Sequence, residues 1–206
     1  MVLGRIKPSS DRVGEWLARP LVAVGFSANG VTGLSLAFAL AGAALLGFGF
    51  LLWGGVAFGL VLVLDMLDGA VARLRGTVSP WGATLDATLD RLGDGLFLLG
   101  LAAYVPTGVG WALALAAAVL GNAVSYVKAK GDLEGAAAGR GRPSSTGVDL
   151  FERTERFFVL YVSILVELAG IGAGRYSAIE AGFALLVVGS LLTLVQRLWR
   201  ARRALA

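Results

Sequence analysis

Apolar residues dominate six stretches of this chain, each about as long as the roughly 20 residues that an α-helix needs to cross a bilayer. The stretches cover approximately residues 31–50, 53–73, 85–105, 108–130, 156–173 and 179–199. The second and third carry acidic residues near one end, so a strict hydropathy threshold would recover only four or five stretches. The pattern predicts an all-α integral membrane bundle of six transmembrane helices, built as a single domain over residues 1–206.

Two segments outside the central apolar stretches differ in character. Residues 8–26 combine Trp16 with Asp11 and Arg12, which favours an amphipathic helix lying in the membrane interface. A simple cytosolic cap on the first spanning helix is the alternative. Residues 131–154 are hydrophilic and small, which is typical of a flexible loop, here expected on the cytosolic side between the fourth and fifth spans.

The composition agrees with a membrane protein and narrows its chemistry. Hydrophobic residues make up 57% of the chain and charged residues 16%, far from the mix of a soluble domain. All Lys and Arg residues except Arg175 fall on one side of the predicted spans, so both termini should be cytosolic in a multi-pass protein of the cell membrane. The net charge of +4 favours anionic lipids and substrates over nucleic acid. Because cysteine and histidine are absent, a metal site must use oxygen ligands, which suits Mg²⁺ or Mn²⁺.

Five aspartates gather at the ends of two consecutive predicted spans. Asp65 and Asp68 are three residues apart, and Asp86, Asp90 and Asp94 follow at four-residue intervals, so each group lies on one helical face. Any one of them could form an ion pair or cap a helix. Carboxylates at membrane depth are costly, and bound divalent cations explain the whole set. The role of Asp94, as a partner of the ligands or as a neutral buried acid, stays open.

The segment DMLDGAVARLRGTVSPWGATLDATLD matches the motif DxxDGxxARx8Gx3Dx3D and so resembles the CDP-alcohol phosphatidyltransferase family. The fixed positions are Asp65, Asp68, Gly69, Ala72, Arg73, Gly82, Asp86 and Asp90. The resemblance implies a six-helix homodimer with a cytosolic site, in which the four aspartates hold two metal ions and the CDP diphosphate lies on these ions. It also implies that Asp90 is the base toward the acceptor hydroxyl.

The residues between the acids allow the same interpretation. Gly69 and Gly82 leave room for a nucleotide diphosphate, and Arg73 can supply a charge-assisted contact to phosphate. Small residues are also frequent where membrane helices simply pack together. The segment FSANGVTG resembles the family's Pro-Asn-x-x-Thr element, with Ala28 in place of the proline. On this basis the predicted CDP-lipid site comprises Thr32, Asn29, Gly69, Ala72, Arg73 and Gly82.

Three further segments, SYVKAKG, FERTER and VQRL, resemble those of phosphatidylinositol phosphate and archaetidylinositol phosphate synthases. This resemblance implies that Lys128, Arg156 and Arg197, with Arg153 as a fourth cation, hold the phosphate of inositol 1-phosphate. Cations that converge from three helix ends are suited to a dianionic group. Each could instead set the topology or contact lipid headgroups. Whether Lys130 touches substrate stays open.

These observations predict an enzyme that transfers the phosphatidyl or archaetidyl group of CDP-diacylglycerol or CDP-archaeol to inositol 1-phosphate, with release of CMP. Glycerol 3-phosphate is the alternative acceptor, as in a phosphatidylglycerophosphate synthase. An alternative of another class is a divalent-cation transport protein. That class requires polar groups through the midplane of the membrane, whereas the acids gather at one face, with Glu167 as the main exception.

Overall fold

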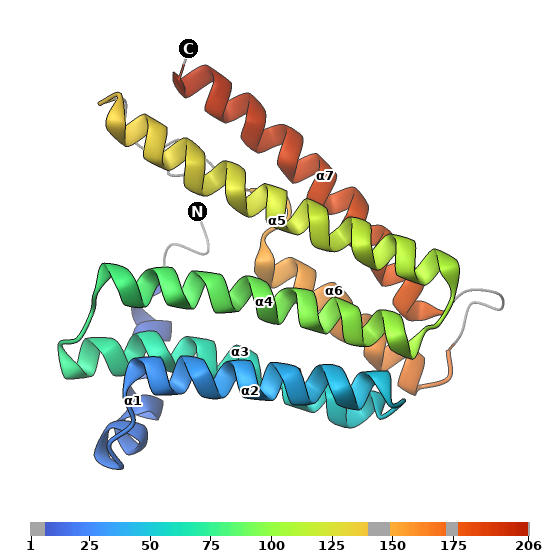
Figure 1. Cartoon of the computed structure of the whole chain (residues 1–206), viewed down its shortest axis with the longest axis horizontal. Helices are drawn as coiled ribbons and strands as arrows, with labels where there is room; N and C mark the ends of the chain where they lie inside the picture. The colour runs from blue at the N-terminus through green and yellow to red at the C-terminus, as the bar shows by residue number, and fades with distance from the viewer. Residues whose placement is uncertain (1–6, 140–148, 172–176, 206) are drawn as a thin grey trace. The chain divides into compact units, whose positions relative to one another are not determined.

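The computed structural model describes residues 7–139, 149–171 and 177–205, with side chains from residue 14 onward. Within these ranges the regular elements are all α-helices (Figure 1): α1 Lys7–Ala23, α2 Ala28–Gly47, α3 Leu51–Arg75, α4 Pro80–Tyr104, α5 Gly108–Ala137, α6 Arg153–Leu168 and α7 Ala178–Leu205. The chain divides into two compact units, Met1–Gly100 and Leu101–Ala206. Arg175, which the positive-inside argument placed on the far side, lies outside the described residues.

In the first unit, α2 and α3 form a helical hairpin against which α4 packs. Small residues set the close spacing, because a Cβ on Gly42 would come within 2.8 Å of the Phe58 ring. A Cβ on Gly100 of α4 would likewise come within 2.9 Å of the backbone of Ala43. The rings of Phe58 and Phe97 stack with centroids 4.2 Å apart and join α3 to α4. The acidic ends of α3 and α4 are thereby carried on a closely packed scaffold.

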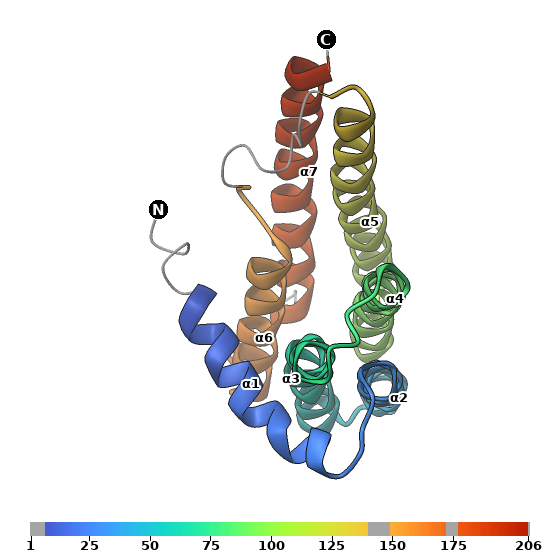
Figure 2. The same ribbon diagram turned by 90° about the vertical axis from the view of Figure 1, so that its left-hand side faces the viewer.

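Helix α1 packs on α3 in a direction different from that of the hairpin. Figure 2 looks along α2, α3 and α4, whereas α1 runs across the view. Ala18 is fully buried in a cluster with Val31, Ala70 and Val71, and Trp16 is 67% exposed. The orientation fits a helix that lies in a membrane interface while its neighbours cross the bilayer. The helix ends at Ala23, slightly before the predicted end of the 8–26 segment.

In the second unit, α5 and α7 lie side by side and α6 packs on α7. Glu167, near the end of α6, accepts hydrogen bonds from the Ser177 hydroxyl at 2.9 Å and from the Ala178 amide at 2.8 Å. These contacts satisfy polar groups at the start of α7, where a negative charge is also favoured by the helix dipole. Glu180 is buried nearby and accepts a hydrogen bond from the Thr107 hydroxyl. Glu167 therefore has a structural role in joining α6 to α7.

Each of the six predicted spans corresponds to one of the helices α2 to α7. In the described part of the chain, four helices (α2, α3, α5 and α7) are long and apolar enough to cross a membrane. Helix α4 carries Asp86, Asp90, Arg91 and Asp94, and α6 has 16 residues, which is short for a span. The chain is an all-helical membrane protein, and the count of six spans stays a prediction.

The predicted loop 131–154 is shorter than expected. Helix α5 continues through Ala137, so residues 131–137 are helical, and α6 begins at Arg153 with a capping box formed by Glu152 and Glu155. At Gly131 the helix packs against α7, where a Cβ would lie 3.8 Å from that of Ala201. Residues 140–148 of the predicted loop lie outside the described residues.

Candidate active site

Hydroxyl groups on α2 contact the aspartates of α3. The Ser35 hydroxyl donates a hydrogen bond to Asp65 at 2.6 Å, and the Thr32 hydroxyl donates to Asp68 at 2.8 Å. Both pairs are three residues apart on their own helices, so the two hydroxyls face the two carboxylates across the hairpin. Thr32, Ser35 and Asp68 are each no more than 5% exposed. Such contacts fix the orientation of both carboxylates.

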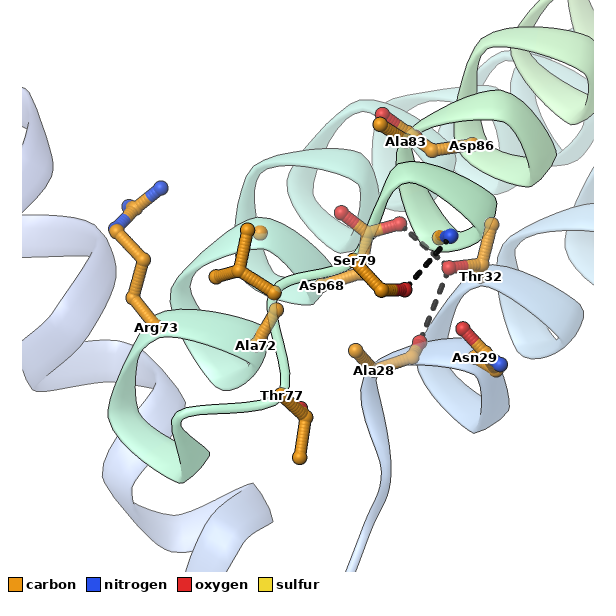
Figure 3. A pocket seen from close by; sticks show the side chains of 13 residues that line it. Ala28, Asn29, Thr32, Asp68, Ala72, Arg73, Thr77, Ser79, Ala83 and Asp86 are labelled. Carbon is orange, nitrogen blue, oxygen red and sulfur yellow. Dashed lines mark hydrogen bonds between the residues drawn. The ribbon is translucent and has the colours of Figure 1, made fainter.

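A pocket of about 280 Å³ opens beside Asp68 within the first unit (Figure 3). Its lining includes every residue of the predicted CDP-lipid site, namely Thr32, Asn29, Gly69, Ala72, Arg73 and Gly82, together with Asp68 and Asp86. The turn between α3 and α4 contributes Thr77 and Ser79, and Gly76 permits this turn with its left-handed φ of 65°. Segments from α2, α3 and α4 therefore converge on one polar cavity.

The two motif glycines shape this pocket in different ways. A Cβ added to Gly69 would meet only the Arg73 Nη1 atom, at 3.6 Å, so Gly69 borders open space. At Gly82, the amide donates a hydrogen bond to the Ser79 hydroxyl at 3.0 Å, and a Cβ would lie 3.2 Å from that oxygen. Gly69 thus keeps the cavity open, while Gly82 allows the turn to fold tightly at its edge.

Arg73 lines the pocket but is also tied to α1. Its Nε lies 3.7 Å from a carboxylate oxygen of Glu15, and the two side chains are 45% and 40% exposed. Figure 3 shows the Arg73 side chain directed away from Asp68. The predicted contact between Arg73 and phosphate therefore requires a different orientation of this exposed side chain.

The four predicted metal ligands share the first unit but are not all equivalent. Asp65 and Asp86 both lie near enough to Asp68 to interact with it electrostatically. Of the four aspartates, Asp68 and Asp86 line the pocket, and Asp65 and Asp90 do not. Among the described residues, no group of three or more Asp or Glu side chains is gathered closely enough to hold a metal ion. The donor chemistry nevertheless fits Mg²⁺ or Mn²⁺, since carboxylate oxygens on adjacent helices are hard ligands. Asp94 forms an ion pair with Arg91 at 3.4 Å.

The predicted acceptor site lies in the second unit, along one face of α5. The Arg156 guanidinium rests against Gly121, in the space that a Cβ would fill. One turn further, the Arg197 Nη1 atom donates to the Val124 carbonyl at 2.7 Å, and the exposed Lys128 follows on the next turn. Arg156 and Arg197 thus approach the face of α5 that carries Lys128.

The remaining cations of this region are held by local contacts. The Arg153 guanidinium lies 5.1 Å from the centre of the Phe157 ring, close enough for a cation–π interaction. Lys130 pairs with Glu134 four residues along the surface of α5. Asp149 forms ion pairs with both Arg197 and Arg200. The sequence did not single out Asp149, and it did not single out Ser35, although the i, i+3 spacing of Ser35 from Thr32 was a usable signal.

A polar pocket with flanking carboxylates, set among apolar helices, is suited to a membrane protein that binds a charged ligand. Cations from three helices, Lys128 of α5, Arg156 of α6 and Arg197 of α7, add the means to hold an anion. The sequence model described as CDP-alcohol phosphatidyltransferase matches residues 26–195. The chain belongs to the CDP-alcohol phosphatidyltransferase family, a family of transferases.

Relatives named as phosphatidylinositol phosphate or archaetidylinositol phosphate synthases match nearly the whole chain. The phosphatidylinositol phosphate synthase of Mycobacteroides abscessus is 35% identical over 191 residues, which are 90% of this chain and 82% of the relative. The archaetidylinositol phosphate synthase of Pyrococcus horikoshii is 27% identical over 208 residues, which are 99% of this chain and 98% of the relative. The similarity is therefore not confined to the aspartate motif.

Solved structures of the phosphatidylinositol phosphate synthase of Mycobacterium tuberculosis share the fold. The structure with CDP-DAG bound superposes with a TM-score of 0.73 at 32% identity, covering 92% of this chain and 94% of that chain. The structure in complex with manganese and citrate gives a TM-score of 0.74 at 31% identity, covering 92% and 88%. In that relative, both a CDP-lipid and a divalent metal ion therefore bind to the same fold.

Proposed function

We propose that the protein transfers the phosphatidyl or archaetidyl group of a CDP-lipid to inositol 1-phosphate and releases CMP. The observation that carries the proposal is the pocket beside Asp68, which is lined by all six residues assigned to the CDP-lipid from the sequence. The relatives named phosphatidylinositol phosphate synthase and archaetidylinositol phosphate synthase support the same donor and acceptor chemistry. The site would face the cytosol, with both termini on that side, six spans and a homodimeric assembly.

In the proposed reaction, the acceptor hydroxyl attacks the phosphorus that carries the lipid, and the bond to the departing CMP breaks. Asp90 takes the hydroxyl proton, a role suited to a carboxylate in a chain without histidine. Thr32 and Asn29 line the pocket that would hold the nucleotide, and Arg73, once turned from Glu15 toward the pocket, would contact its phosphates. Asp65, Asp68, Asp86 and Asp90 would hold the divalent ions, which offset negative charge on the diphosphate when bound.

The acceptor assignment rests on the row of cations in the second unit. Arg156 and Arg197 approach the face of α5 that carries Lys128, with Arg153 at the start of α6. A phosphomonoester carries close to two negative charges, and several cations on one face match it better than they match an uncharged polyol. Because glycerol 3-phosphate carries the same group, this row selects a phosphorylated acceptor without choosing between the two.

The proposal is tested by identifying the product. Purified protein is incubated with Mg²⁺, with CDP-diacylglycerol or CDP-archaeol, and with inositol 1-phosphate, glycerol 3-phosphate or unphosphorylated inositol. We expect CMP release and a lipid product of matching mass with inositol 1-phosphate. Preference for glycerol 3-phosphate would establish the alternative acceptor. Metal flux into liposomes without CDP-lipid turnover would instead support a transport protein. The structural role of Glu167, near the end of α6, removes from that hypothesis the main acid that lay apart from the others.

Gly69→Val should impair use of the CDP-lipid without unfolding the protein. Gly69 borders open pocket space, so the added side chain would occupy the volume assigned to the donor. We expect the KM for CDP-lipid to rise by roughly tenfold or more, which corresponds to about 1.4 kcal/mol of lost binding. The KM for the acceptor and the thermal midpoint should change little.

Gly33→Val provides the matched control for this substitution. Gly33 lies on α2, outside the pocket lining, and a Cβ there would meet nothing within 4 Å. The control should leave both KM values near those of the wild type. An unchanged CDP-lipid KM in Gly69→Val would show that the donor does not enter this pocket.

A further inference from the structure

Residues 149–151, which precede α6, are attached to α7 by successive contacts. The Phe151 ring fills the space above Gly189, where a Cβ would come within 2.6 Å of a ring carbon. The Leu150 amide donates to the Gln196 side chain at 3.1 Å, and the carboxylate of Asp149 reaches the next turn of α7. This short segment therefore sets the position of the start of α6 along α7.

Asp149 is the charged end of this attachment. Its Oδ2 atom accepts hydrogen bonds from the Nε and Nη2 atoms of Arg197, and its Oδ1 atom accepts one from the Nη1 atom of Arg200 at 2.9 Å. The side chain of Asp149 is only 10% exposed, that of Arg197 is 11% exposed and that of Arg200 is 18% exposed. A carboxylate this buried is tolerated because both oxygens are paired, and the triad keeps one net positive charge.

Arg197 is therefore held from two sides. The Asp149 carboxylate binds its Nε and Nη2 atoms, while its Nη1 atom donates to the Val124 carbonyl on α5. The orientation of the guanidinium is fixed relative to the face of α5 that carries Lys128. The same segment leads directly into α6, whose first turns bear Arg153 and Arg156.

We propose that Asp149 is a positioning residue of the acceptor-phosphate site, which orients the Arg197 guanidinium and aligns the α6 arginines with it. The inference rests on the proposed function, in which these cations hold the phosphate of the acceptor. Asp149 itself does not contact the substrate. Its negative charge would repel a phosphate, so its contribution is to the geometry of the site.

If Asp149 acts through geometry, Asp149→Asn should have the opposite effect to the one that its charge alone predicts. Simple electrostatics predicts that removing a negative charge beside the site lowers the KM for a phosphorylated acceptor. If Asp149 positions Arg197, the KM for inositol 1-phosphate should instead rise, by roughly fivefold or more, because misplacing a binding group by about 1 Å is already costly. The KM for CDP-lipid should stay within about twofold, a change worth well under 1 kcal/mol.

Glu134→Gln is the matched control for the loss of charge. Glu134 lies on the exposed surface of α5 and, within the described part of the chain, forms an ion pair with Lys130, so its substitution removes one negative charge without touching Arg197. Its acceptor KM should be unchanged or slightly lower.

A double variant tests whether Asp149 acts through Arg197. In an Arg197→Gln background, Asp149→Asn should add little to the rise in acceptor KM, because the group that Asp149 orients is gone.

The possible outcomes are distinct. A rise in acceptor KM that is confined to the acceptor and disappears in the Arg197→Gln background supports the proposal. An unchanged or lower acceptor KM in Asp149→Asn would overturn it, as would equal rises in both KM values. If Asp149→Asn cannot be purified, Asp149→Glu keeps the charge but displaces the carboxylate, and an unchanged acceptor KM in that variant would also contradict the proposal. Absence of CMP release by the wild type with any phosphorylated polyol would refute the proposed function instead.

Discussion

Asp90→Asn is expected to abolish group transfer while leaving CDP-lipid binding largely intact. Asp90 lies one turn beyond Asp86 on α4 and is half-buried, but it does not line the pocket assigned to the donor. An asparagine keeps the shape of the side chain but cannot take a proton from the acceptor hydroxyl. General-base catalysis contributes roughly 10² to 10⁴ in rate, and loss of a metal ligand adds to this, so we expect a fall in kcat of at least about 10³.

The prediction is checked by measuring CMP release and, separately, equilibrium binding of a CDP-lipid to the same purified variant. Asp94→Asn is the matched control, since it removes the next carboxylate on the same face of α4. Asp94 forms an ion pair with Arg91 on the same helix, which is a structural role. We therefore expect a much smaller loss of activity from Asp94→Asn. Turnover at the wild-type rate in Asp90→Asn would remove Asp90 from both of its proposed roles.

The helical framework could be predicted because a bilayer dictates the length and polarity of the segments that cross it. Each apolar stretch found in the sequence contains most of one helix between α2 and α7. The extension of α5 through Ala137 was missed because Gly131, Asp132 and Gly135 have low helix propensity when they are considered alone. In the structure, Gly131 and Gly135 are buried and favour helix packing instead.

The lining of the pocket could also be predicted, since fixed spacing along a helix determines which side chains share a face. The motif placed Asp68, Gly69, Ala72 and Arg73 on α3, and they do line one cavity with Gly82. The orientation of Arg73 could not be predicted in the same way. It depends on how α1 packs against α3, which brings Glu15 within 3.7 Å of its guanidinium.

Contacts between distant segments could not be predicted from the sequence for a similar reason. The pair of Ser35 with Asp65 depends on the register of α2 against α3, which no local pattern specifies. Asp149 and Arg197 are 48 residues apart, and their ion pair requires the segment before α6 to lie along α7. The sequence predicted the cations at the ends of spans, whereas α5 continues beyond Lys128 and α7 continues beyond Arg197. The carboxylate that holds Arg197 became visible only in the structure.

Asp65→Asn is expected to weaken divalent-metal binding by at least about 100-fold, a larger effect than the roughly 10- to 100-fold typical for loss of a residue that only supports a metal ligand. The substitution replaces a charged oxygen donor with a neutral amide, and Mg²⁺ and Mn²⁺ depend on carboxylate oxygens for their affinity. Ser35→Ala is the graded comparison, because it keeps Asp65 but removes the 2.6 Å hydrogen bond that orients its carboxylate. We expect that variant to lose about tenfold in affinity.

Both variants are measured by titrating the purified protein with Mn²⁺ and following the free ion by electron paramagnetic resonance, so that the result does not depend on turnover. Thr84→Ala serves as a control, since the Thr84 hydroxyl is exposed and donates only to the backbone of its own helix. Wild-type affinity in Asp65→Asn would exclude Asp65 as a ligand. An ordered loss, larger for Asp65→Asn than for Ser35→Ala, would establish that the hydroxyls of α2 support a metal site on α3, and that the packing of the first unit tunes its affinity.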